Sequence, residues 1–227
     1  MKRGVVALIL ALLIPLANAG AIDIIAAGGS LGILIISNTV EGSAPNPVVN
    51  TLGGFMVLRL AEPELDLVPS LDILWLNYEN RDGRAIPTEV ETGNGNNVFA
   101  LGFLLDLPVC MTFRFGPPVT ENTANRFAAS IFGGTSFLFR ICTKGDTDPE
   151  SAALMEENLA AVASWLWGGG RWFYPMIGTR FSVVLQDNFT FQIGVKAYIP
   201  IFNLWNAEPN VIDAGMLNIQ LAMQAKL

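Results

Sequence analysis

Apolar and polar residues alternate along most of this chain. The last eleven residues are the clearest example, with Leu217, Ile219, Leu221, Met223, Ala225 and Leu227 on one side and Asn218, Gln220, Ala222, Gln224 and Lys226 on the other. A period of two residues is that of a β-strand, whose successive side chains point to opposite faces. The pattern predicts a strand with one apolar face and one polar face.

The same alternation predicts eight strands. Their ranges are 22–36, 52–60, 70–79, 97–116, 126–141, 171–185, 189–199 and 217–227. A turn signal at Asp106-Leu107-Pro108 would divide the fourth strand and give nine strands, an odd number that is unusual for a bacterial barrel. However, the apolar residues from Phe99 to Phe115 keep one parity across this signal. We therefore expect one long strand, bent at Pro108, that extends beyond the hydrocarbon layer, which a tilted strand crosses in about 9–11 residues.

The N-terminus has the features of a secretory signal. Lys2 and Arg3 precede an apolar run, residues 5–16, and Ala17-Asn18-Ala19 supplies the small residues that a signal peptidase requires. We expect cleavage before Gly20, so that residues 1–19 are a signal peptide and residues 20–227 form the mature barrel. The alternative, an uncleaved inner-membrane helix, is disfavoured by the short apolar core and by Pro15.

The composition narrows the fold class. The chain is 52% hydrophobic and has a mean hydropathy of +0.45, yet beyond residue 19 no charge-free apolar stretch of about 18 residues could cross a bilayer as a helix. A closed barrel is the other structure that satisfies every backbone polar group in lipid. We therefore predict an all-β fold, an eight-stranded antiparallel transmembrane β-barrel surrounded by outer-membrane lipid. A secreted β-sandwich, which also alternates, is the alternative.

The lengths of the connections fit a barrel of this class, which has short periplasmic turns and longer outer loops. The predicted inner turns are 61–69, 117–125 and 186–188, and the predicted outer loops are 37–51, 80–96, 142–170 and 200–212. In the longest loop, Asp148-Pro149 predicts the start of one short helix over residues 150–166. This helix either packs on the barrel rim or covers the pore. Aromatic residues at its exit are candidates for the outer membrane interface; they are Trp165, Trp167, Trp172 and Tyr174. Trp172 and Tyr174, however, have the parity of the interior.

The chain offers little catalytic chemistry. It contains no His, which removes the Ser–His arrangements of barrel hydrolases and the commonest metal ligand. We expect no enzyme activity, no cofactor and no metal site. If Gly116 pairs with Arg126, Cys110 pairs near Phe132 and Cys142 near Ala100, about ten residues apart along the wall, so a disulfide is disfavoured. Without Lys2 and Arg3 the chain has 11 basic and 20 acidic residues, a net charge of −9, which argues against nucleic acid as a partner.

The parity of each strand predicts which side chains fill the lumen. The charged candidates are Asp72, Arg114, Arg140, Arg180 and Lys196. The apolar candidates for binding a ligand are Leu74, Leu76, Leu104, Phe132, Leu138, Trp172, Met176 and Tyr198. Buried charges of both signs usually pair, and an eight-stranded barrel is just filled by side chains or holds one small ligand. Bulk diffusion, as through a porin, is therefore not expected.

The chain resembles the small eight-stranded outer-membrane proteins of the OmpW-like type. The resemblance rests on the signal ending in Ala17-Asn18-Ala19, the strand count, the long strand 97–116 and the partly apolar lumen. It implies a hydrophobic channel that opens sideways and takes up small hydrophobic molecules. The chain departs from the usual pattern at Leu227, where the signal read by the barrel-assembly machinery usually ends in an aromatic residue. This departure suggests a divergent machinery, such as that of spirochaetes.

Two functional hypotheses follow. The first is a narrow channel or uptake barrel for a small hydrophobic ligand, favoured because a merely structural plug does not need the apolar lumen set. The alternative is a closed surface barrel whose outer loops serve as adhesin, receptor or antigen.

Overall fold

A computed structural model describes residues 23–38, 46–61, 65–88, 97–118, 125–144, 152–186, 188–208 and 210–227. The predicted signal peptide, residues 1–19, lies outside the described residues. Within the described ranges, no helix has both the length and the apolarity to span a bilayer.

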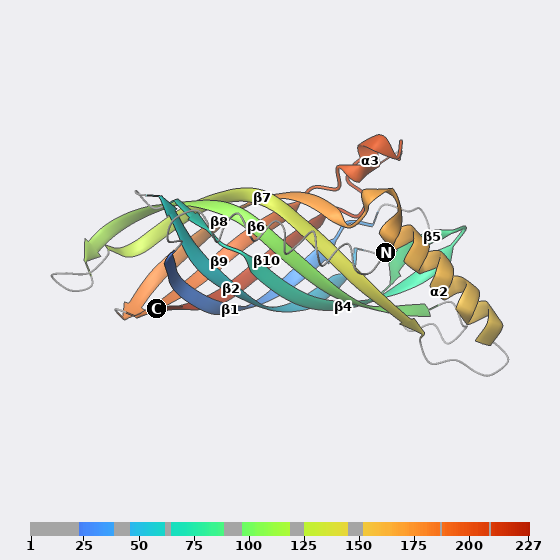
Figure 1. Ribbon diagram of the computed structural model, residues 1–227, viewed down its shortest axis with the longest axis horizontal. Coiled ribbons are helices and arrows are strands. Elements are labelled where there is room, and N and C mark those ends of the chain that lie inside the picture. The colour runs from blue at the N-terminus through green and yellow to red at the C-terminus, as the bar shows by residue number, and fades with distance from the viewer. Residues whose placement is uncertain are drawn as a thin grey trace.

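Eight long antiparallel strands close a barrel (Figure 1). They are β1 (Asp23–Ile36), β2 (Val48–Ala61), β4 (Ser70–Arg81), β6 (Asn97–Pro118), β7 (Asn125–Lys144), β8 (Phe173–Gln186), β9 (Phe189–Tyr198) and β10 (Met216–Lys226). The first and last strands pair with each other, with Ile33 opposite Ile219, so the sheet has no open edge there. The predicted fold class is confirmed.

The long strand is continuous, as its parity predicts. β6 pairs with β7 on both sides of Pro108, which lies opposite Gly134. A Cβ atom at Gly134 would collide with the carbonyl of Leu107, so a glycine is required beside the proline. The register also agrees with the prediction, because Cys110 lies opposite Phe132 and Cys142 opposite Ala100. Both cysteines are free thiols.

Three short elements lie in segments for which the sequence predicts only connections. β3 (Leu65–Leu67) pairs with β2 and β6 in the inner turn. β5 (Arg84–Thr88) forms a hairpin with β4. Asp82 and Gly83 connect this hairpin with φ angles of 52° and 78°, the left-handed pair that a two-residue type I′ turn requires. α3 (Phe202–Trp205) lies between β9 and β10.

The outward faces of the strands are apolar and carry two aromatic clusters. Phe115, Phe127 and Phe181 stack near one end, with ring centroids 6.0–6.2 Å apart. The other cluster contains Phe137, Phe139, Trp167, Trp172 and Phe173. Along β7, the ten residue steps from Phe127 to Phe137 rise about 25 Å if the strand tilts by about 40°. That height matches the apolar band of an outer-membrane barrel, so the clusters mark its two interfaces.

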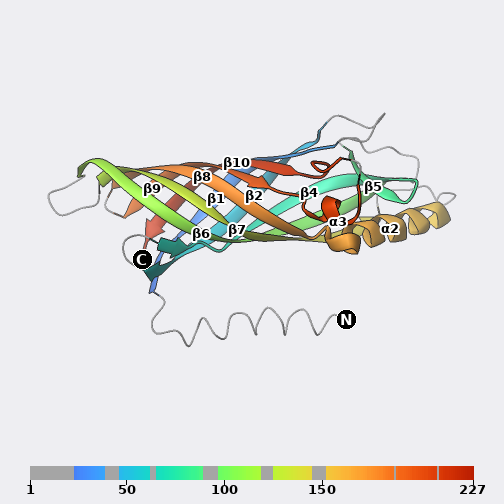
Figure 2. The same cartoon turned by 90° about the horizontal axis from the view of Figure 1, so that it is seen from above.

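The end of the barrel opposite the C-terminus is covered. There α2 (Ala152–Trp167), β5 and α3 gather (Figures 1 and 2), and we call it the outer end because the long connections lie there. Met155, Val162 and Leu166 of α2 join the same buried core as Leu76 and Tyr78 of β4. The predicted helix is therefore confirmed. It packs against β5 and the outer ends of β4, β6 and β7, with its buried side chains in the core at the mouth of the barrel.

Candidate functional site

Halfway along the lumen, a buried lysine binds two carboxylates. Lys196 Nζ lies 2.7 Å from Asp106 Oδ2 and 3.4 Å from Asp72 Oδ2, and neither aspartate is exposed to solvent. The hydroxyl of Tyr198 donates to Asp106 at 3.0 Å, and the amide of Gln220 donates to Asp72 at 2.8 Å. We call these five residues the lysine cluster. Each carboxylate thus accepts more than one hydrogen bond, as a buried charge requires.

The lysine cluster spans the lumen from wall to wall. Its side chains come from β4, β6, β9 and β10, and Ser30 of β1 adds a hydrogen bond to Asp72 at 3.1 Å. In the ring of strands, β9 and β4 are four positions apart, which is the opposite side of an eight-stranded barrel. These contacts therefore cross-link the two walls and occupy the pore. Within the described residues, no group of three potential metal ligands is present.

On the periplasmic side of the lysine cluster lies a pocket that we call the inner pocket. Its lining includes Phe55, Cys110, Phe132, Arg180 and Gln192. Arg180 Nη2 lies 3.4 Å from the sulfur of Cys110, and its guanidinium lies 6.0 Å from the centre of the Phe132 ring. The inner pocket combines Arg180, and Lys196 of the lysine cluster, with an aromatic and thiol wall.

A second pocket, the outer pocket, lies beneath α2. Its lining includes Ile36, Tyr78, Arg84, Ile86, Arg140, Trp165, Leu166, Arg171, Tyr174, Phe202, Asn203 and Asp213. The buried Arg140 donates from Nη1 to the carbonyl of Arg171 at 3.2 Å and from Nη2 to the hydroxyl of Tyr174 at 3.5 Å. Its guanidinium lies 6.0 Å from the centre of the Tyr78 ring.

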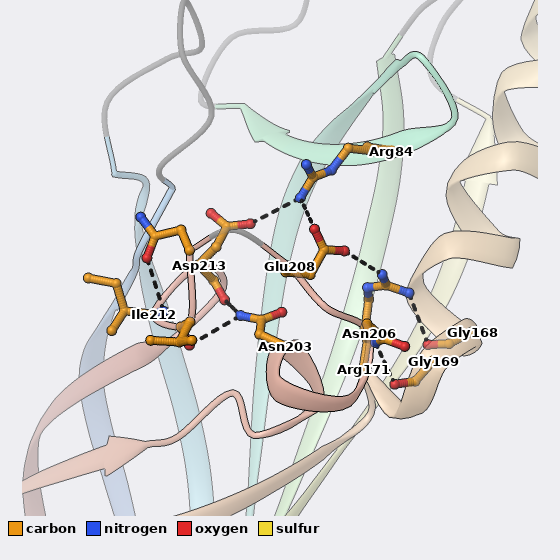
Figure 3. A network of polar contacts seen from close by, with 11 residues as sticks. Arg84, Gly168, Gly169, Arg171, Asn203, Asn206, Glu208, Ile212 and Asp213 are labelled. Carbon is orange, nitrogen blue, oxygen red and sulfur yellow. Dashed lines mark hydrogen bonds and ion pairs between the residues drawn. The ribbon is translucent and has the colours of Figure 1, made fainter.

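Ion pairs hold the cover together (Figure 3). Arg84 Nη2 lies 3.2 Å from one oxygen of Glu208 and 3.6 Å from Asp213, while Arg171 Nη2 lies 3.0 Å from the other oxygen of Glu208. The Arg171 guanidinium also stacks on Trp165 at 3.5 Å. Burial lowers the pKa of Arg171, and the carboxylate of Glu208 opposes that shift. We call α2, β5 and residues 199–215, joined by these contacts, the cap.

The cap loop is also fixed by backbone contacts. Trp205 Nε1 and Asn206 Nδ2 donate to the carbonyl of Gly169 at 3.0 and 2.9 Å. Gly169 has a φ of 57°, in the left-handed region that favours glycine. Asn203 donates to the carbonyls of Val211 and Asp213. The loop between β9 and β10 is therefore anchored on the glycine turn η2 (Gly168–Gly170) that follows α2.

The structure brings most of the predicted lumen residues inside the barrel. Nine of them have buried or half-buried side chains in the packed core, the lysine cluster or the two pockets; they are Asp72, Leu74, Leu76, Leu104, Phe132, Leu138, Arg140, Met176 and Arg180. Lys196 and Tyr198 belong to the lysine cluster.

One predicted lumen residue is placed elsewhere, so that prediction was wrong. Trp172 stacks on Phe137 with ring centroids 6.0 Å apart, and Phe137 alternates with the buried Ser136 and Leu138, so both rings lie on the outer surface. β8 begins only at Phe173, after the glycine turn, so strand parity does not extend to Trp172. Arg114 keeps the predicted inward parity, opposite the buried Ala128, but it is exposed near the inner end of the barrel.

Sequence reasoning missed two participants. Asp106 has inward parity but stands in an apparent turn signal, which hid its role as the closest partner of Lys196. Tyr174 is fully buried beside Arg140, although its aromatic neighbours suggested the membrane interface. Its alternation with Phe173 was the available signal.

No family model and no curated protein matches the chain. Among solved structures, the chain is similar to Ail, the attachment invasion locus protein of Yersinia pestis. With the Ail complex containing the heparin analogue sucrose octasulfate, the TM-score is 0.42 and the identity 8%, over 90% of this chain and 100% of that chain. With Ail alone the values are 0.39 and 7% over the same shares. Similarity at this level says nothing about shared activity.

The barrel's own surface assigns it to a membrane. Closed rings of strands with an apolar outer band between aromatic interfaces are the barrels of outer membranes. The protein is therefore a small outer-membrane β-barrel.

Proposed function

We propose that the protein is a closed surface barrel that acts through one part of its cap, the loop between β9 and β10, as an adhesin or receptor. The observation that carries this proposal is the filled lumen. The lysine cluster joins opposite walls, and beyond it Leu76, Leu104 and Leu138 pack into one core with α2. A barrel closed in this way transmits no solute without rearrangement. We therefore expect the outer end, which faces the surroundings of the cell, to carry the function.

The cap has the exposed apolar side chains that such a role needs. In the loop between β9 and β10, the exposed fractions are 68% for Leu204, 58% for Trp205, 52% for Val211 and 60% for Ile212. Apolar side chains gathered on a surface that faces water favour contact with a partner. Because the ion pairs and the glycine turn hold this loop in place, a partner would meet a preformed surface at low entropic cost.

Uptake of small hydrophobic molecules remains a prediction. The apolar residues that would line the channel pack against one another and against α2. Passage along the lumen would therefore require α2 to move away and the ion pairs of Lys196 to break. Three related expectations also remain predictions. They are the OmpW-like assignment, a spirochaete-type assembly machinery and a bound hydrophobic ligand.

An adhesion assay with bacteria that display the protein tests the proposal. The double variant Leu204→Ser/Val211→Ser removes two exposed apolar side chains without touching the buried Phe202 or Asn203. Leu154→Ser, at an exposed apolar position of α2 outside the loop, is the matched control. We expect wild type and Leu154→Ser to adhere to cultured epithelial cells and the double variant to lose adhesion.

Surface amounts are equalised by protease accessibility, and folding is checked by heat-modifiable migration on a denaturing gel. Adhesion that is unchanged in the double variant would contradict the proposal. So would stepwise conductance of the wild-type protein in planar bilayers, because a filled lumen should carry no ions.

A further inference from the structure

The outer pocket contains one more positive charge than its described partners neutralise. Arg84 and Arg171 share Glu208, and Arg84 also contacts Asp213. Asp213 is the acidic side chain in the pocket lining, and this contact engages it. Among the described residues, no carboxylate forms an ion pair with Arg140.

Arg140 is nonetheless buried, with 7% of its surface exposed. The groups that it contacts are neutral: the carbonyl of Arg171, the hydroxyl of Tyr174 and the face of Tyr78. Its Nε has no hydrogen-bond partner although no solvent reaches it. A guanidinium stays charged under all ordinary conditions, and a buried charge without a counter-ion is strongly unfavourable. A buried cation with this surrounding has the chemistry of an anion-binding site.

The remaining lining defines the kind of anion. The planar fork of a guanidinium matches a carboxylate, which can accept two parallel hydrogen bonds. Ile86, Leu166 and Phe202 supply apolar surface around the same space. We propose that the outer pocket binds a small monocarboxylate with an apolar body, whose carboxylate lies against Arg140 and whose body lies under α2. The inference goes beyond the proposed surface function and does not depend on it.

A bound carboxylate would connect the cap to the barrel wall. Arg140 belongs to β7, while Leu166 belongs to α2 and Phe202 to α3. A ligand that touches all three elements stabilises the covered state in proportion to its occupancy. The same ligand class therefore would regulate how firmly the cap is held.

The test is isothermal titration calorimetry of the refolded protein in detergent, with sodium butyrate as the probe. 1-Butanol is the neutral analogue, and sodium phosphate and sodium chloride are the bare anions. We expect saturable binding of one butyrate per chain and no saturable binding of butanol. Phosphate or chloride binding as tightly as butyrate would overturn the proposal, because the apolar body would then contribute nothing.

Variants locate the site. Arg140→Met should weaken butyrate binding by roughly tenfold or more, the usual effect of losing hydrogen bonds to a charged group. Arg180→Met is the matched control, because Arg180 is the arginine of the inner pocket, and it should bind butyrate as the wild type does. Arg140→Lys keeps a buried cation in case Arg140→Met fails to fold, and should also bind more weakly because lysine lacks the planar fork.

Glu41, Glu89 and Glu91 lie outside the described residues, so a triple variant with glutamine at these positions tests whether one of these three side chains supplies the carboxylate. Butyrate binding that is equal in the wild type and the triple variant supports an external ligand. Binding that arises only in the triple variant would overturn the proposal. Absence of butyrate binding in both proteins would overturn it as well.

Discussion

Two buried cations in the same barrel have opposite surroundings. Lys196, in the middle of the lumen, contacts two carboxylates at 2.7 and 3.4 Å. Arg140, beneath the cap, contacts a carbonyl and a tyrosine hydroxyl at 3.2 and 3.5 Å. Both side chains are almost fully shielded from solvent. The difference therefore lies in the charge of the partners and not in burial.

This comparison separates a structural charge from a candidate binding charge. The lysine cluster pairs its cation with two carboxylates, from β4 and β6, so it joins the walls and offers no unpaired cation to a ligand. The outer pocket differs, because its buried cation, Arg140, forms no ion pair with a carboxylate of the described residues. A buried charge is stable when it is paired and hydrogen-bonded, so the unpaired cation is the one from which binding is expected.

The largest expected effect is at the lysine cluster. Lys196→Met leaves the carboxylates of Asp72 and Asp106 buried without their cation, so we expect the free energy of unfolding to fall by about 3–5 kcal/mol. Urea unfolding in lipid vesicles, followed by tryptophan fluorescence, measures it. Adding Asp72→Asn and Asp106→Asn to the same chain should restore most of the loss. A loss below about 1 kcal/mol for Lys196→Met alone would show that the cluster does not join the walls.

A smaller and local effect is expected in the cap. Glu208→Gln removes the carboxylate that links Arg84 to Arg171, whose side chains are 32% and 12% exposed. Because solvent partly screens the contact with Arg84, we expect opening of the cap to become easier by about 1–2 kcal/mol. Hydrogen exchange should rise in α2 and in residues 199–215 and stay unchanged in β6 and β7. Faster exchange throughout the barrel would mean that the cap and the barrel unfold as one unit.

Arg140→Met should change stability still less when no anion is present. The variant loses two hydrogen bonds but also removes an unpaired buried charge, so the free energy of unfolding should change by no more than about 1 kcal/mol. The same urea titration measures it beside Lys196→Met. A loss as large as that of Lys196→Met would indicate that Arg140 already has a counter-ion, and the contrast between the two cations would disappear.

The smallest effect is expected at an exposed pair on the cap surface. Lys144 Nζ lies 2.6 Å from Glu156, and its hydrogen bond, followed by its charge, lowers the pKa of that carboxyl. Because the pKa of Glu156 is lower in the folded protein than in the unfolded chain, the pair stabilises the fold at pH values above the unfolded pKa. This contribution is lost as the pH falls through the folded pKa, which lies below 4.5. Because the pair is exposed, melting curves of Glu156→Gln and wild type should coincide between about pH 5 and 8. A clear difference there would show that exposed pairs also hold the cap.

Local pattern was sufficient to predict the strands and much of their pairing. The parity from Phe99 to Phe115 identified β6 as one strand, and the turn that follows it placed Cys110 opposite Phe132. A slip by one residue would turn every apolar side chain of a strand toward the lumen, so the pattern itself selects the register. The short β3 and β5 were missed because three to five residues carry too little alternation to identify.

The sequence by itself therefore determined the barrel, the face of most strand residues and the helix in the longest outer loop. Only the tertiary structure decided that Lys196 meets Asp106, ninety positions earlier in the chain, and that Arg140 meets no carboxylate among the described residues. Parity gives the face of a residue but not its height in the lumen, which depends on the tilt and stagger of all eight strands together. Contacts across the lumen, and the packing of α2 over its mouth, exist only after the ring has closed.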